Sequence, residues 1–117
     1  MDDALRPYCP YYAKAVEMIG RRWAGAVLRA LLAGSARFNE IAAAVPGMTD
    51  KLLSQRLKDL EADGLITRRV HGTTPVRIEY ALTDKGAALG QVLLALNRWA
   101  VEWIELPEEA ERPARSS

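Results

Sequence analysis

A stripe of polar side chains lies on one face of the helix expected after Thr49, and its members are Lys51, Ser54, Gln55 and Lys58. This recognition stripe carries no acid and lies opposite the leucine face of the same helix. Lysine neutralises phosphate or reaches guanine, glutamine pairs with the edge of adenine, and serine can do either. These residue types at this spacing are typical of a helix that reads the major groove of DNA, although an ordinary solvated helix face gives the same pattern.

A second polar cluster surrounds a short loop after that helix, and it consists of Arg68, Arg69, His71, Thr73, Thr74 and Arg77. Its cations and hydroxyls could straddle a phosphate backbone or enter a minor groove. Charges on exposed strands also discourage pairing with other chains, which is the alternative interpretation. Further candidates for DNA contact are Arg37, Thr49 and Arg56, with Arg56 on a side face of the helix.

The two clusters lie on elements whose limits the sequence marks. Helical spacing of apolar residues predicts helices over 11–19, 23–33, 38–45 and from the cap at Thr49 to Gly64. The period then changes to two, which predicts strands over 66–70 and 78–82 with a hairpin loop at 71–75 between them. A last helix runs from its cap at Thr83 to about Trp103, and the acidic tail 107–117 is expected to be frayed and flexible.

The third and fourth helices, with the turn Pro46-Gly47-Met48 between them, have the spacing of a helix-turn-helix. The hairpin that follows supplies a wing. We therefore expect a mainly α fold with a small β wing, a winged helix-turn-helix in a single domain over residues 1–106. The part expected to read DNA spans residues 38–82.

Length and composition exclude several classes of protein. A chain of 117 residues, 50% hydrophobic and 26% charged, fits one ordinary globular domain. One cysteine and one histidine exclude an intrachain disulfide and a zinc site, and no phosphate-binding loop or catalytic cluster indicates an enzyme or a cofactor. No apolar run approaches the roughly 18 residues of a membrane span, and the acidic start is unlike a signal peptide, so we expect a cytoplasmic protein. Because the net charge is only +1, DNA binding must rest on where the cations lie.

The last helix carries more apolar surface than one core face requires. Its main stripe includes Leu89, Leu93, Leu96, Ala100 and Trp103. A domain this small hardly covers such a stripe alone, which favours a homodimer over a helix buried in a monomer. A symmetric dimer would present two reading helices about one helical turn of DNA apart and recognise a pseudo-palindromic operator.

The chain resembles the HxlR family of winged-helix regulators, relatives of the MarR type. The residues that carry the resemblance are Cys9-Pro10, Ile19-Gly20 leading into Arg22-Trp23, and the segments 37–41, 45–49, 51–57, 60–66 and 78–83. The resemblance implies a dimeric prokaryotic transcription factor, more often a repressor, with DNA contacts from the fourth helix and the wing. It also implies dimer contacts from the helices 11–20 and 83–104, which adds Tyr11, Tyr12 and Trp99 to the interface. The wing departs from the family, since His71-Gly72 stands where Tyr-Pro is common.

Cys9 precedes Pro10 at the start of the first expected helix, where the helix dipole favours a thiolate and where Arg6 and Lys14 could add to this effect. In several members of the resembled family, a cysteine at this place looks like the sensor of quinones, aldehydes or oxidants. Without a second cysteine, oxidation can give only an intersubunit Cys9 disulfide, a mixed disulfide with a small thiol, or an adduct. The equal alternative is a small apolar residue packed under the dimer helices.

Two further alternatives stay open. An apolar or aromatic effector would fit a pocket formed by Tyr8, Tyr11, Tyr12, Met18, Trp23, Trp99 and Trp103, although such residues more often form core or dimer contacts. The same fold could also serve as a protein-interaction module without sequence-specific DNA binding, because the chain is only weakly basic. The acid-free recognition stripe argues against this module. Together with the resemblance, the sequence predicts a repressor that an effector, or modification of Cys9, releases from DNA.

Overall fold

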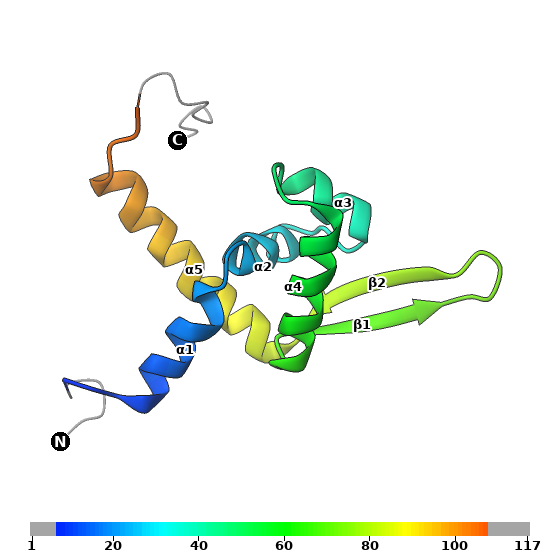
Figure 1. The fold of residues 1–117 in the computed structure, drawn as a ribbon, viewed down its shortest axis with the longest axis horizontal. Helices are drawn as coiled ribbons and strands as arrows, with labels where there is room; N and C mark the ends of the chain where they lie inside the picture. The colour runs from blue at the N-terminus through cyan, green and yellow to red at the C-terminus, as the bar shows by residue number, and fades with distance from the viewer. Residues whose placement is uncertain (1–6, 108–117) are drawn as a thin grey trace.

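Residues 7–107 are described by the computed structural model of this chain, and they form helices and one two-stranded sheet. In chain order the elements are α1 (Pro10–Gly20), α2 (Ala24–Leu32), α3 (Phe38–Ala44), α4 (Asp50–Ala62), β1 (Ile66–His71), β2 (Arg77–Leu82) and α5 (Asp84–Trp103) (Figure 1). The predicted mainly α fold with a small β wing is confirmed. The predicted flexible tail lies, beyond residue 107, outside the described residues.

The helix α4 begins where its cap predicts. The Thr49 hydroxyl accepts a hydrogen bond from the backbone N–H of Leu52 at 3.1 Å, which satisfies one of the unpaired donors of the first turn. In the turn before it, Gly47 has a φ of +95°, a backbone conformation that residues with a Cβ rarely adopt. The turn and the cap together set the angle at which α4 leaves α3.

The strands β1 and β2 pair antiparallel, with Ile66 opposite Leu82 and His71 opposite Arg77. The loop predicted over 71–75 therefore began one residue too early, because His71 ends β1. Ile66 at the base of β1 is buried and β2 is partly buried from Ile78 to Leu82, whereas the rest of β1 is exposed. The outer part of the hairpin projects from the helical body as a wing (Figure 1).

The core gathers around α2, which packs against each of the other helices and against β2. The largest fully buried side chains are Val27, Leu28, Ile41, Leu53, Leu57, Leu60, Leu65 and Ile66. Three of these, Leu53, Leu57 and Leu60, form the leucine face of α4, which points inward as its spacing predicts. The polar face is left on the outside.

The start of α5 is tied to the end of α4 at a joint formed by residues 63–65 and 83–86. The Thr83 hydroxyl donates to the Gly64 carbonyl at 2.6 Å and accepts from the Gly86 N–H at 3.0 Å. The Lys85 ammonium donates to the Asp63 carbonyl at 2.6 Å. Gly86 lies so close to Leu65 that a Cβ at this position would be 1.9 Å from the Leu65 carbonyl oxygen.

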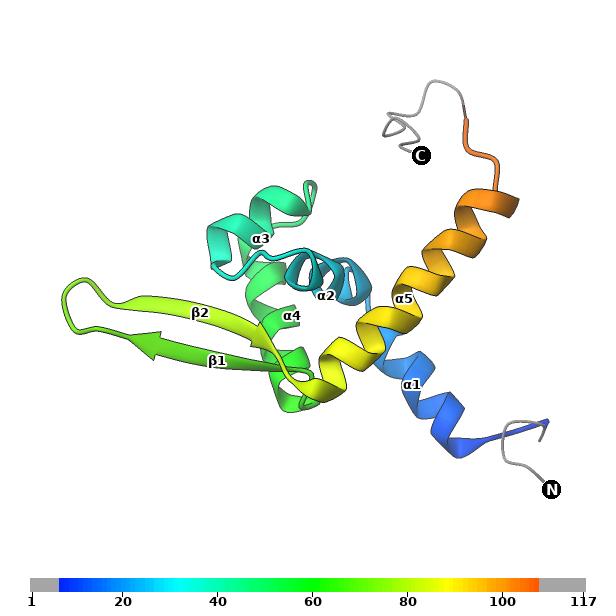
Figure 2. The ribbon, with the colours of Figure 1, turned by 180° about the vertical axis from the view of Figure 1, so that it is seen from behind.

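The wing and the terminal helices extend from opposite sides of the body (Figure 1), and the view from behind shows the same arrangement (Figure 2). We call α1 and the C-terminal half of α5 the arm. Large apolar side chains are exposed along it, namely Tyr11, Tyr12, Val16, Leu96, Trp99, Val101 and Trp103. The arm therefore carries an exposed apolar surface, and this surface lies far from the wing.

Candidate nucleic-acid interface

The recognition stripe lies on the outer face of α4. Lys51, Ser54, Gln55 and Lys58 are all exposed, whereas the leucines on the opposite face are at most 2% exposed. Within residues 7–107, the side chains of Lys51, Ser54 and Lys58 form no hydrogen bond or ion pair. Their donors are therefore available to a ligand, and their contact with DNA stays a prediction.

Asp59 lies at the edge of the recognition stripe, which corrects the expectation of a face without acids. The Gln55 Nε2 donates to Asp59 Oδ1 at 3.0 Å, one helical turn along α4. The Asp59 side chain is only 23% exposed. Sequence reasoning missed it because Asp59 belongs to the flank of the helix and reaches the stripe only through the orientation of its carboxylate.

Arg56 is held against the body of the protein in this conformation, unlike the lysines of the recognition stripe. Its Nε donates to the backbone carbonyl of Arg22 at 2.7 Å, and its Nη1 donates to Asp59 Oδ2 at 2.8 Å. The side chain is 18% exposed. Arg56 thus joins α4 to the connection between α1 and α2, residues 21–23.

An ion pair also fastens the α1–α2 connection to the C-terminal end of α4. Arg21 Nη1 lies 2.8 Å from Asp63 Oδ2, and this hydrogen bond raises the pKa of Arg21 above its ordinary value. Next in the connection, Trp23 has a left-handed φ of +73°, and the Arg22 guanidinium lies 5.3 Å from the centre of its ring. Sequence reasoning missed Arg21 and Asp63 because no local spacing marks two partners 42 residues apart.

The predicted wing contacts are exposed, but they are divided between the two faces of the hairpin. They are Arg68, Arg69, His71, Thr73, Thr74 and Arg77. Arg69 and His71 share one face with Arg77, whereas the neighbouring Arg68 points to the other face. On the first face, His71 Nε2 lies 2.9 Å from Glu79 Oε1. A duplex on either side of the wing would therefore meet at least one arginine.

Arg37 is exposed at the N-cap of α3, the first helix of the helix-turn-helix. The N-terminal end of this helix is capped by Glu40. The Glu40 Oε1 accepts hydrogen bonds from the backbone N–H of Ala36 at 2.9 Å and from that of Arg37 at 2.8 Å. These two bonds, the one from Ala36 first, hold the pKa of Glu40 below its usual range. The side chain of Arg37 is left on the surface, and its role stays a prediction.

Cys9 is the N-cap residue of α1 and is partly exposed on the arm. Its carbonyl accepts from the Ala13 N–H at 2.9 Å, so the thiol sits at the first turn of the helix. Lys14, which was expected to add positive charge there, is paired with Glu17 at 3.1 Å, and Arg6 lies outside the described residues. The sensor role and the packing role of Cys9 both stay predictions.

The residues predicted at a dimer interface are divided between the core and the surface. Leu93 is 6% exposed and packs over Gly25 of α2, so it is corrected to a core residue of its own chain. Leu89 also packs partly against this core, and Ala100 is half-buried. The aromatic members and one leucine remain exposed, namely Tyr11, Tyr12, Leu96, Trp99 and Trp103. This exposed subset is what a partner could cover.

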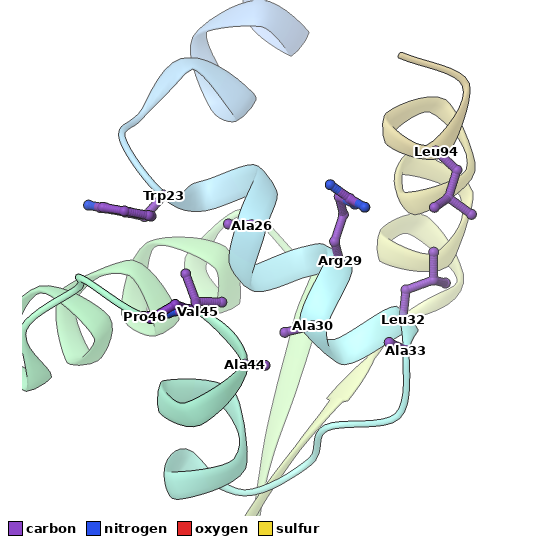
Figure 3. Close-up of a pocket in the computed structure, with 10 residues that line it drawn as sticks. All are labelled: Trp23, Ala26, Arg29, Ala30, Leu32, Ala33, Ala44, Val45, Pro46 and Leu94. Carbon is purple, nitrogen blue, oxygen red and sulfur yellow. The ribbon is translucent and has the colours of Figure 1, made fainter. Parts of the chain in front are cut away.

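The residues considered from the sequence for an aromatic pocket differ in burial. Met18 is buried in the core, whereas Tyr8, Tyr11, Tyr12, Trp99 and Trp103 are exposed. An apolar groove of about 520 Å³ opens beside α2 (Figure 3). It is lined by Trp23, Ala26, Arg29, Ala30, Leu32, Ala33, Ala44, Val45, Pro46 and Leu94. Trp23 is the one aromatic residue that this groove shares with the expected pocket.

No helix between residues 7 and 107 is long and apolar enough to cross a membrane. Over the same residues, no three His, Cys, Asp or Glu side chains are grouped so that they could hold a metal ion.

Residues 18–108 match the family of HxlR-like helix-turn-helix proteins. The HTH-type transcriptional regulator YvaP of Bacillus subtilis (strain 168) is 50% identical over 97 residues, which cover 83% of this chain and 90% of YvaP. The reduced form of the transcriptional regulator YodB from B. subtilis is similar with a TM-score of 0.73 and 38% identity, over 84% of this chain and 96% of YodB. The oxidised form of the redox regulator HypR is similar with a TM-score of 0.74 and 32% identity, over 84% of this chain and 100% of HypR. YodB structures also include diamide-treated and quinone-bound forms.

Proposed function

This chain belongs to the HxlR-like helix-turn-helix family of transcriptional regulators, and from that membership we propose that it is a homodimeric repressor of a nearby gene. The class predicted from the sequence, a helix-turn-helix transcriptional regulator, is confirmed by the membership. The observation that supports the finer proposal best is the recognition stripe, which is exposed on the outer face of α4 beside the projecting wing.

In this proposal α4 enters the major groove of double-stranded DNA. Lys51 and Lys58 would neutralise phosphates or reach guanine, and Gln55 would read a base edge. Arg77 and the loop threonines of the wing would contact the flanking backbone or minor groove, with Arg37 and Thr49 near the start of the helices. Arg56 is left out of this set, because the Arg22 carbonyl and Asp59 hold its side chain against the body of the protein.

The arm is the proposed dimer interface. Trp103 is 67% exposed and Tyr11 is 78% exposed, and large aromatic groups in water favour burial against a partner. A symmetric pair of arms would hold two recognition stripes about one helical turn of DNA apart, which fits a pseudo-palindromic operator. In this arrangement residues 1–106 act as one unit, in the cytoplasm and without catalytic activity.

Cys9 is the proposed site of control. Its place at the exposed first turn of α1 is compatible with attack on a small electrophile or oxidant, and modification there would alter the arm. Two regulators of similar structure support this, since YodB has been solved in quinone-bound and HypR in oxidised form. The packing role remains the alternative, and a Cys9→Ser variant separates the two.

Selection of bound fragments from genomic DNA, followed by footprinting, tests the proposal. We expect a symmetric site with two half-sites about one helical turn apart. The double variant Lys51→Ala/Gln55→Ala should then lose at least about tenfold in affinity for that site, because each good base or phosphate contact is worth on the order of 1 kcal/mol or more. The control Gln91→Ala removes the same residue type as Gln55→Ala at an exposed position outside both α4 and the arm, and it should bind like the wild type. Equal affinity of the double variant and this control would refute the proposed reading face.

A further inference from the structure

A chain of hydrogen bonds runs from the α1–α2 connection to the recognition stripe. The Arg22 carbonyl accepts from Arg56 Nε at 2.7 Å, and Arg56 Nη1 donates to Asp59 Oδ2 at 2.8 Å. The other carboxylate oxygen, Asp59 Oδ1, accepts from Gln55 Nε2 at 3.0 Å. Asp59 therefore has one partner that belongs to the body of the protein and one that belongs to the stripe.

The chemistry of these groups fixes the direction of every bond in the chain. A carboxylate has only acceptors and a guanidinium has only donors. Gln55 can therefore satisfy Asp59 only with its Nε2, because a flipped amide would set Oε1 against Oδ1. Asp59 cannot turn away either, since Arg56 is held in place by the Arg22 carbonyl and would lose its partner. Asp59 therefore fixes the orientation of the Gln55 amide.

We propose that Asp59 is a positioning residue that sets the base preference of Gln55, an inference that rests on the proposed reading role of the recognition stripe. With one Nε2 hydrogen on Asp59, Gln55 presents its second Nε2 hydrogen and its Oε1 outward, one donor and one acceptor. Adenine offers the matching pair, an N7 acceptor and an N6 donor, whereas guanine offers two acceptors, N7 and O6. Gln55 held in this orientation should favour adenine over guanine by about tenfold at the base pair it contacts.

The variant Asp59→Asn tests the orientation directly. Because Arg56 can only donate, it retains the oxygen of the new amide, and the amide nitrogen then faces Gln55. Gln55 must accept from that nitrogen with Oε1, which turns both Nε2 hydrogens outward. Two donors fit guanine better than adenine, so the preference for adenine should fall to about twofold or less, or reverse.

The matched control is Glu61→Gln, which removes the same charge from the same helix. Glu61 is exposed, and its side chain forms no hydrogen bond or ion pair within the described residues. The probes are duplexes that the wild-type protein selects from a randomised pool, together with every single-base variant of them. Both substitutions should strengthen binding to all duplexes to a similar degree, because each removes one negative charge near phosphate. Only Asp59→Asn should change the base preference.

Two outcomes separate this inference from the function on which it rests. An Asp59→Asn base profile equal to that of Glu61→Gln would overturn the positioning role while leaving the reading role intact. A wild-type protein that selects no preferred sequence from the pool would overturn the reading role itself. Melting temperatures of both variants show whether they are folded.

A measurement on the wild-type protein tests the inference even if Asp59→Asn does not fold. The chain has two glutamines, Gln55 and Gln91, so their side-chain amide resonances are identified by one Gln55→Ala spectrum. One proton of the Gln55 amide should exchange with water more slowly than the other and than both protons of the exposed Gln91. Equally fast exchange of all four would overturn the proposed orientation.

Discussion

Alanine in place of Gly86 should destabilise the whole chain, because it forces apart the joint between α4 and α5. A Cβ there would lie 1.9 Å from the Leu65 carbonyl oxygen, 2.9 Å from the Leu65 carbonyl carbon and 3.2 Å from Leu82 Cδ2. Two of these atoms belong to the backbone and cannot rotate away. The same carbonyl accepts from the Thr83 N–H at 3.1 Å, so a shift of Leu65 also weakens the cap that begins α5.

The size of the effect follows from this geometry. Overpacking a protein core costs about 1–3 kcal/mol, and a clash with fixed backbone belongs at or above the upper end of that range. Alanine returns about 1 kcal/mol of helix propensity relative to glycine. The free energy of unfolding should therefore fall by about 2 kcal/mol or more, which for a chain of this length lowers the melting temperature by at least about 8 °C.

A series of glycine variants, melted side by side by circular dichroism, separates the clash from helix propensity. At Gly20, the last residue of α1, nothing lies within 4 Å of a new Cβ, so alanine should be neutral or stabilise by up to about 1 kcal/mol. At Gly90 the nearest atom is Leu32 Cδ2 at 3.1 Å, the end of a flexible side chain, so the cost should stay within about 1 kcal/mol. If Gly86→Ala has the same melting temperature as Gly20→Ala, the close approach of α5 to Leu65 does not constrain the fold, and the prediction is wrong.

Three further predictions concern the wing, the thiol and the turn before α3. Arg77→Ala should weaken binding to all duplexes alike and lower the slope of log affinity against log salt by about one. The control Arg29→Ala, at an exposed position of α2, should leave the slope unchanged, and equal slopes would exclude a phosphate contact. Cys9→Ser should bind the operator normally but resist release by diamide or quinone, and release that persists would exclude a thiol sensor. Because backbone N–H groups hold the pKa of Glu40 below its usual 4.5, its charge stabilises α3 above that pH, and this contribution disappears as the pH falls through the lower pKa of the folded state. The melting temperatures of wild type and Glu40→Gln should therefore converge in acid, and a difference that is constant with pH would contradict this.

The elements were predictable where a local signal marks them. Thr49 and Thr83 cap α4 and α5 with their own hydroxyls, and a cap involves residues only a few positions apart. The change from helical to alternating spacing likewise locates the wing, because it is a property of consecutive residues. For the same reason the outer and inner faces of α4 could be assigned from the sequence alone.

The interactions around Arg56 and Leu93 were not predictable in this way. Arg56 reaches a carbonyl 34 residues earlier in the chain, and no spacing rule connects two such positions. Leu93 has the periodicity of an apolar helix face, but periodicity does not say whether that face meets its own chain or another. Only the packing of α5 over Gly25 decides this, and that packing depends on the whole fold.

The wing is a two-stranded hairpin anchored at its base, where Ile66 is buried, Leu82 packs against the core and the Tyr80 N–H donates to the Ala36 carbonyl at 2.7 Å. An isolated pair of strands is marginally stable in water, so the outer part of this hairpin should open with a smaller free energy than the global unfolding of the core. Its amide protons would then exchange far sooner than those of α4. A ligand that orders the hairpin must offset the lost conformational entropy, so the wing arginines contribute less net affinity than their number suggests. The same looseness lets one hairpin adapt to grooves of different width, which a rigid strand pair would not.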